Sequence, residues 1–269
     1  MEWYSSAIKN DTPLFVRYHL QEQNYEYLNN SDQETITNVS FVCKHYEENA
    51  RKIGQIHDNL PTSVIPNILD TRIQYIGKND NFSIGFVGMV PARKRLDLAL
   101  DLLEKLLHHD RRYTLNIVGK KPEEYAWLMK REEERDYFQQ INARIESNPL
   151  LKSNVKFLGY VDDIREFFSS VGHVISTSDF ESFHLTLADG PVHGAAAHTL
   201  KWEGAASIYT KDWLNDSIEE MAQTIINSNE SNLTGYHAYQ QSLHLVKQMS
   251  PEIVGLSILE AMYGGNSVE

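Results

Sequence analysis

Short apolar runs alternate with longer segments of helical periodicity along most of the chain. The runs are rich in valine, isoleucine and phenylalanine and largely continuous in hydrophobicity, as strands buried on both faces are. They predict strands at residues 14–18, 39–43, 63–66, 83–87, 114–118, 155–158, 173–177 and 196–200. Because helical segments separate these runs, the pattern predicts an α/β fold with a doubly wound parallel sheet.

The helical segments differ in how much of their surface is apolar. Residues 93–107 carry leucines and an alanine on one face and charged residues elsewhere, which predicts an amphipathic helix. Residues 122–145 are polar and predict a mostly solvated helix or helix pair. Ser250 and Pro251 combine a helix N-cap with proline at the first helical position, so we expect a final helix through Met262.

Composition and charge restrict the class of protein. The formal net charge of -12 argues against nucleic acid as a partner. No run is long and apolar enough to span a bilayer and no signal-peptide pattern follows Met1, so we expect a cytoplasmic protein. The single cysteine, Cys43, excludes an internal disulfide and lies in an apolar run that predicts a core position. Two basic clusters, residues 93–95 and 120–121, each follow a predicted strand and suit a small anionic ligand.

The candidate site should lie where parallel strands end, because ligands of open α/β sheets bind outside the carboxyl ends of the strands. Glu181 and Asp189 lie eight positions apart around a turn that follows a predicted strand and enters a short helix. Backbone amides at this helix N-terminus would favour a diphosphate, and the two carboxylates could accept hydrogen bonds from sugar and ribose hydroxyls. The amides concerned are those of Phe183, His184, Leu185 and Thr186. Spacing alone also fits a capped helix with acidic surface residues, and by itself favours that interpretation.

Several motifs of other enzyme classes do not occur. The sequence has no P-loop, no G-x-G-x-x-G and no G-x-S-x-G, which argues against a P-loop NTPase, a dinucleotide dehydrogenase and an α/β hydrolase. His108 and His109 are adjacent, and adjacent residues point apart on a helix, so we expect a solvated helix end rather than a metal site. We expect neither a cofactor nor a bound metal.

The segment from Phe180 to Asp189 resembles the E-x7-E element of retaining GT-B glycosyltransferases of family four, also called glycosyl transferases group 1. Four more segments occur in the order that this family uses. Residues 63–70 resemble the end of the acceptor-side domain, and residues 86–95 resemble the first donor-domain strand with its glycine-then-basic loop. Residues 115–120 resemble the second strand with its glycine turn, and residues 155–161 resemble the strand and loop beside the nucleobase. The ordered set, spread over residues 14–200, is more specific than any single motif.

The resemblance implies a GT-B architecture. We expect a partial N-terminal, acceptor-side Rossmann-like domain at residues 1–72, a nucleotide-sugar-binding domain at residues 73–240, and helices at residues 241–269 that cross back toward the N-terminal part. Acceptor-side domains of this fold normally have a complete sheet of their own. We therefore expect the chain to be a fragment of a longer enzyme, or to be completed by a homo-oligomer or a missing-domain partner.

The function implied is transfer of a sugar from a nucleotide-diphosphate sugar to an unknown glycan or lipid-linked acceptor, with retention, in bacterial polysaccharide or glycoconjugate synthesis. The Asp-x-Asp metal clamp of the other glycosyltransferase class does not occur, so we expect metal-independent transfer. The reaction is expected in the cytoplasm or at the inner face of the membrane. Two alternatives stay open: a catalytically degenerate binding or partner subunit, and a GT-B nucleotide-sugar epimerase.

The resemblance also implies roles for single residues. Lys94 would neutralise the leaving diphosphate, with Arg93 or Arg95 assisting, because charge develops on the departing phosphate oxygen. Glu181 and His19 are implied as further catalytic residues, although His19 could equally be a strand-end histidine tied to a loop backbone. The donor-binding residues implied are Gly88, Arg93, Arg95, Gly119, Lys120, Gly159, Tyr160, Phe183, His184, Leu185, Thr186 and Asp189.

Three positions depart from the family pattern. Met89 stands where the family usually has arginine, Asp189 where it usually has glutamate, and His184 where a small residue is common. These changes leave the ligand class intact and put the nucleotide, the sugar and the rate in question. Met89 removes one expected phosphate contact unless Arg93 or Arg95 supplies it.

Overall fold

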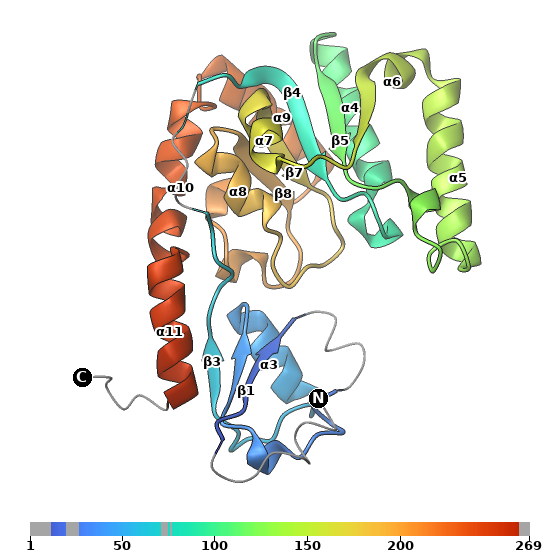
Figure 1. The fold of residues 1–269 in the computed structure, drawn as a ribbon. Coiled ribbons are helices and arrows are strands. Elements are labelled where there is room, and N and C mark those ends of the chain that lie inside the picture. The colour runs from blue at the N-terminus through green and yellow to red at the C-terminus, as the bar shows by residue number, and fades with distance from the viewer. Residues whose placement is uncertain (1–11, 20–26, 71–74, 76, 264–269) are drawn as a thin grey trace.

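Two parallel β-sheets, one small and one large, organise the chain in a computed structural model that describes residues 12–19, 27–70, 75 and 77–263 (Figure 1). The small sheet has the strand order β1-β2-β3 and the large one the order β6-β5-β4-β7-β8-β9. The strands are β1 (Phe15–Tyr18), β2 (Asn38–Phe41), β3 (Thr62–Val64), β4 (Asp80–Val87), β5 (Thr114–Val118), β6 (Val155–Gly159), β7 (Val171–Ser176), β8 (Ala196–Leu200) and β9 (Leu214–Asn215). Each predicted strand overlaps an observed one, and the expected α/β fold with parallel sheets is confirmed.

Helices follow most strands and cover both faces of the large sheet (Figure 1). The α-helices are α3 (Lys44–Lys52), α4 (Leu96–His109), α5 (Glu132–Ser147), α6 (Pro149–Asn154), α7 (Ile164–Ser170), α8 (Thr186–Val192), α9 (Ile218–Glu230), α10 (Tyr236–Gln248) and α11 (Pro251–Tyr263). Short 3-10 helices are η1 (Gln33–Thr35), η2 (Ala92–Lys94), η3 (Pro122–Glu124), η4 (Ala205–Ser207) and η5 (Lys211–Trp213).

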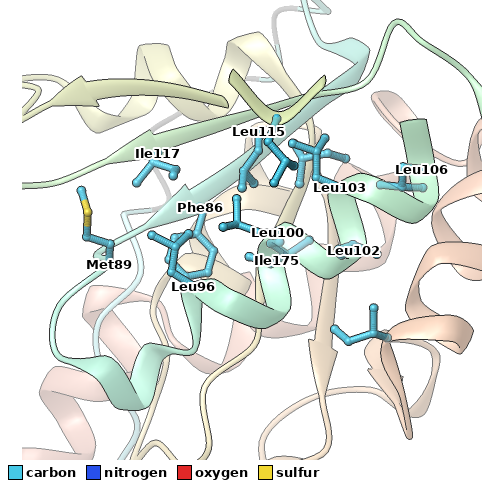
Figure 2. Packing of buried hydrophobic residues seen from close by; sticks show 14 of the residues in the cluster. Phe86, Met89, Leu96, Leu100, Leu102, Leu103, Leu106, Leu115, Ile117 and Ile175 are labelled. Atoms are coloured by element: carbon cyan, nitrogen blue, oxygen red, sulfur yellow. The ribbon is translucent and has the colours of Figure 1, made fainter. Parts of the chain in front are cut away.

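The two faces of the large sheet carry separate hydrophobic clusters. On one face, α4, α5 and α9 pack against β4, β5 and β7, and Figure 2 shows Leu100 and Leu103 of α4 next to Phe86 and Leu115 of the sheet. On the other face, α7, α8 and α10 pack against β7 and β8. A Cβ atom on Gly190 would lie 2.4 Å from a methyl carbon of Val174, so glycine lets α8 lie directly on β7.

The start of α4 differs from the prediction. The helix expected from residue 93 begins at Leu96, and the preceding residues form η2. Arg95 separates the two with a left-handed backbone conformation, at a φ of 54°. This conformation interrupts the helical path, so the three basic residues precede the first turn of α4. Their side chains point instead toward the segment that follows β7, as the ion pairs described below show.

The C-terminal helices run along the side of the molecule. α10 packs against α8, and α11 continues to the small sheet and packs beside β2 (Figure 1). The backbone N–H of Leu69, in the connection between the two sheets, donates to the carbonyl of Met249 at 2.8 Å. These contacts hold the small sheet beside the large one. The domain boundaries at residues 72 and 240 stay predictions.

Cys43 is 3% exposed and belongs to the core of the small sheet. β9 was not expected, because its two residues form no apolar run. Among the described residues, no helix combines the length and the apolar character that crossing a membrane requires.

Candidate functional site

The loops that follow β4 and β7 meet at one edge of the large sheet. The two strands are parallel neighbours, so their carboxyl ends bring both loops to the same place. The Thr177 hydroxyl lies 2.9 Å from the carbonyl oxygen of Lys94 and 2.8 Å from that of Arg95. The backbone N–H of Asp179 donates to the Arg93 carbonyl at 2.9 Å. Hydrogen bonds therefore fix the loop with the three basic residues 93–95 against the loop that carries Glu181.

Glu181 is the centre of a buried cluster of charges. Its Oε1 accepts a hydrogen bond from Lys94 Nζ and another, at 2.9 Å, from Ser178 Oγ. Arg93 Nη1 lies 3.2 Å from the same oxygen. The side chains of Glu181 and Lys94 are only 7% and 13% exposed. One carboxylate thus faces two cations in a place from which water is largely excluded.

Burial and charge act in opposite directions on Glu181. Burial would raise the pKa of this carboxyl, but the electrostatic interactions with His184, Lys94 and Arg93 outweigh it and hold the pKa below its ordinary value. Burial lowers the pKa of Lys94, and the attraction of Glu181 only partly opposes this. Both side chains depend on each other for their charged state.

Arg95 is engaged differently from its two neighbours. Its Nη2 donates to Asp97 at 2.8 Å and its Nη1 to Asp179, also at 2.8 Å. The hydrogen bonds to Asp97, followed by those to Asp179, raise the pKa of Arg95. Two carboxylates therefore neutralise this guanidinium, whereas Arg93 and Lys94 share Glu181.

The His184 peptide is held by a residue that the sequence analysis did not single out. Tyr209 Oη accepts from the His184 N–H at 3.2 Å and donates to the His184 carbonyl at 2.7 Å. The His184 imidazole is buried and bonds to the Val87 carbonyl. Burial, and then the charge of Lys94, lower its pKa to about 3, so the ring is neutral at neutral pH. Of the four amides expected at this turn, that of His184 already has an acceptor.

The second carboxylate lies inside the short helix α8. Burial raises the pKa of Asp189 to about 6, and the charge of Asp70 acts in the same direction. The charges of both Glu181 and Asp189 act on the Tyr209 hydroxyl. The pKa of Glu181 is therefore lowered by its surroundings, whereas that of Asp189 is raised.

Three predicted glycines end the strands β4, β5 and β6. Gly88, Gly119 and Gly159 have φ values of 77°, 129° and 71°, in the region that favours glycine. The Gly88 N–H donates to the Val118 carbonyl and the Gly119 N–H to the Gly159 carbonyl, both at 2.8 Å. These bonds align the three loops side by side at one edge of the sheet.

Beyond these glycines, the predicted donor-binding side chains differ in their exposure to solvent. Lys120 and Tyr160 are exposed, Tyr160 to 71%. Phe183 is half-buried and lies against the ring of Tyr209, while Leu185 is exposed and Thr186 is buried. Tyr160 therefore presents a free aromatic ring beside the glycine-ended strands.

Met89 points away from this edge. Its side chain is 2% exposed and packs in the core beside Phe86 and Leu96 (Figure 2). It also lines a cavity of about 200 Å³ together with Lys121 and Phe157. Core packing accounts for methionine at this position.

The small sheet also reaches the site. Burial raises the pKa of Tyr46, at the start of α3, and the charges of Glu181 and Arg93 act on its phenol. His45 packs against Gly204, where an added Cβ would lie 2.6 Å from the histidine side chain. His19 directly follows β1 and is half-buried, and its catalytic role stays a prediction. Ser178, Tyr209 and Tyr46 were not singled out because no recognised motif contains them.

Among the residues that the structure describes, no group of three or more histidine, cysteine or carboxylate side chains could hold a metal ion. The charged groups at the site are the cations and the carboxylates already described.

Comparison with protein families gives one match. Residues 81–229, more than half of the chain, match the model of the family described as Glycosyl transferases group 1. No curated protein matches the sequence significantly.

Solved structures share the fold at low sequence identity. HepE of Anabaena in complex with UDP and glucose has a TM-score of 0.76 and 19% identity, over 94% of this chain and 72% of HepE. A TarM variant of S. aureus has a TM-score of 0.73 and 16% identity, over 95% of this chain and 51% of TarM. The pneumococcal O-GlcNAc transferase GtfA, in complex with UDP and GlcNAc, has a TM-score of 0.71 and 13% identity, over 93% of this chain and 53% of GtfA. The chain thus has the fold of GT-B glycosyltransferases and spans about half the length of TarM and GtfA.

Proposed function

The chain belongs to the glycosyl transferases group 1 family, and we propose that it transfers a glycosyl unit from a nucleotide-diphosphate sugar to an acceptor with retention of the anomeric configuration. The proposed site rests on one contact. Lys94 and Arg93 share the buried carboxylate of Glu181 where the loops after β4 and β7 meet.

This cluster suits a ligand that has both a diphosphate and a sugar. A diphosphate oxygen can replace Glu181 as the partner of Lys94, because both present negative charge to the ammonium group. Glu181 is then released to accept hydrogen bonds from sugar hydroxyls. During transfer, the bond between the anomeric carbon and the phosphate oxygen breaks, and the negative charge on that oxygen is stabilised by Lys94 with Arg93. Since Arg95 is held by Asp97 and Asp179, we assign the assisting role to Arg93.

The proposed donor is a uridine diphosphate sugar. HepE has been solved with UDP-glucose and GtfA with UDP and GlcNAc. We place the nucleotide along Gly88, Gly119 and Gly159, whose loops are aligned, and the base beside Tyr160. Asp189 would accept from the ribose hydroxyls when ionised. His19 and Tyr46 would face the acceptor from the small sheet.

Release of UDP from UDP-glucose and UDP-N-acetylglucosamine, with and without added glycan acceptors, tests the proposal. We expect Glu181→Gln and Lys94→Met to lower turnover at least a hundredfold, as loss of one electrostatic contact to the transition state does. Lys105→Met is the matched control, since the Lys105–Glu219 ion pair lies on the surface. Turnover in both site variants at the rate of the control would refute the site assignment. Because Lys94 and Arg93 supply the positive charge, we expect EDTA to leave turnover unchanged.

A binding or partner subunit is the second candidate function. Met89 favours a binding or partner subunit. It is buried where the family resemblance led us to expect arginine, so the loop after β4 lacks one cation. A structure of a GtfA/B complex is also among those that share this fold. Calorimetric binding of UDP-glucose with neither transfer nor hydrolysis would select this candidate. In either case we propose a cytoplasmic protein that acts with a second chain.

A further inference from the structure

The two residues before Glu181 are held directly by the loop after β4. The backbone N–H of Asp179 donates to the Arg93 carbonyl at 2.9 Å, and Arg93 Nη1 donates to the Phe180 carbonyl at 2.8 Å. Arg95 Nη1 donates to the Asp179 carboxylate, also at 2.8 Å. Asp179 is thus held through both its backbone and its side chain, two positions before Glu181.

The guanidinium of Arg95 bridges two carboxylates from different segments. Its Nε and Nη2 donate to the two oxygens of Asp97, in the first turn of α4, at 3.0 and 2.8 Å. Its Nη1 reaches Asp179 in the loop after β7. All three nitrogens of the guanidinium are therefore used, and the bridge depends on this planar fork. A lysine would present a single ammonium group, which offers no such fork.

Arg95 also has an uncommon backbone conformation. Its φ of 54° and ψ of 55° lie in the left-handed region, which is strained for a residue with a Cβ atom. Strain of this kind persists where the surroundings hold a residue firmly, and it is concentrated at functional sites. Glycine adopts the same conformation freely, so the arginine side chain must contribute an interaction that offsets the strain.

Helix α5 fixes the other end of the bridge. Tyr137 Oη donates to Asp97 Oδ1 at 2.8 Å and accepts from the Asp97 N–H at 3.0 Å. Burial would raise the pKa of Asp97, but the hydrogen bonds from Arg95 and Tyr137 outweigh it and keep this pKa below its ordinary value. A continuous chain of hydrogen bonds therefore runs from α5 through Asp97 and Arg95 to Asp179.

We propose that Arg95 is a positioning residue, whose bridge from Asp97 to Asp179 holds the loop after β7 against the loop after β4. The bridge keeps the Glu181 carboxylate in place beside Lys94. Arg95 itself contacts neither the diphosphate nor the sugar, because both of its carboxylate partners stay bound to it. This role rests on the proposed glycosyl transfer, in which Glu181 and Lys94 act on the donor.

Arg95→Gly tests the bridge without straining the backbone, because glycine accepts a φ of 54°. The melting temperature should therefore stay close to that of the wild type. The kcat of UDP release should fall by roughly tenfold to a hundredfold with little change in the donor KM, since misplaced groups cost rate. The Asp179 amide proton should exchange with solvent faster, because its bond to the Arg93 carbonyl opens more often. Thermal unfolding, steady-state kinetics and NMR hydrogen exchange measure these effects.

Chemical rescue separates the planar bridge from mere positive charge. The Arg95 side chain is 33% exposed, so millimolar guanidinium can enter the vacated position of Arg95→Gly and should restore kcat. Methylammonium carries the same charge without the fork and should restore little. Arg112→Gly is the matched control, because Arg112 makes the same fork with Asp110 at the other end of α4. This variant should keep the kcat and the Asp179 exchange rate of the wild type.

Unchanged exchange of the Asp179 amide in Arg95→Gly would overturn the inference. Equal rescue by both cations would also overturn it, since charge alone would then be sufficient. A raised donor KM with an unchanged kcat would mean that Arg95 contacts the donor directly, which contradicts a positioning role. Faster Asp179 exchange in a protein whose wild type releases no UDP would support the bridge and contradict the proposed transfer, so the two proposals fail separately.

Discussion

The hydroxyl of Tyr209 is hydrogen-bonded to both the N–H and the carbonyl of His184, at 3.2 and 2.7 Å. The two residues are 25 positions apart in the sequence. The Tyr209 ring is 4% exposed and lies between Phe183, Trp202 and Trp213. A rigid aromatic residue thus fixes the peptide that lies three positions after Glu181, and so helps to hold this carboxylate toward Lys94.

Tyr209→Phe tests this relationship. The variant keeps the ring packing but leaves a buried N–H and a buried carbonyl without their partner, which should lower the free energy of unfolding by about 1–3 kcal/mol. Turnover should fall while the Michaelis constant for the donor changes little, because the carboxylate is positioned less well. Denaturant unfolding and steady-state kinetics measure both effects. Tyr236→Phe is the control, since Tyr236 is 62% exposed, and a similar loss in both variants would contradict the interpretation.

Removal of the Glu181 side chain should destabilise the fold more than removal of the Lys94 side chain. Glu181→Ala leaves two neighbouring cations without their shared carboxylate and should destabilise the fold by about 3–5 kcal/mol. Lys94→Ala leaves Glu181 paired with Arg93 and should destabilise it less. Urea denaturation of both variants measures the difference. UDP should raise the melting temperature of the Glu181→Ala variant more than that of the wild type, because its diphosphate replaces the lost charge. The reverse order of stabilities would show that Arg93 does not hold Glu181.

Asp189 should make stability depend on pH. Its pKa is raised from 3.8 to about 6, so the folded state binds a proton more tightly than the unfolded state does. The contribution of Asp189 to the free energy of unfolding is therefore greatest below pH 3.8. It falls as the pH rises toward 6, by roughly 3 kcal/mol at most. Asp189→Asn should remove this dependence. Denaturation of both proteins between pH 4 and 7 checks it, and parallel curves would contradict the prediction.

Met89 should not tolerate the arginine that the family resemblance led us to expect. The side chain is 2% exposed in the core, so Met89→Arg places an unpaired cation among leucine and phenylalanine side chains. We expect loss of several kcal/mol of stability and no gain in turnover, whereas Met89→Leu should change stability by less than about 1.5 kcal/mol. Thermal unfolding and donor turnover measure both. A stable and faster Met89→Arg variant would mean that this position faces the ligand.

Much of the fold followed from local patterns. The apolar runs at residues 83–87, 114–118 and 173–177 identify strands because side chains buried on both faces must be apolar. The same order of strands places the loops after β4 and β7 together, since parallel strands end at one edge. The prediction that Lys94 and Glu181 lie near each other rested on the family resemblance, and the structure brings the two side chains into contact.

The residue pattern alone was therefore enough to predict the strands and the parallel sheet, and to propose the carboxyl ends of the strands as the place of the site. The tertiary structure decided which partner each charged or polar side chain has. The sequence could not show that Arg95 is held by two carboxylates, that Met89 turns into the core, or that Tyr209 holds His184. These outcomes depend on burial and on contacts between distant segments, because the free energy of a charge or hydrogen bond is set by its surroundings rather than by its neighbours in the chain.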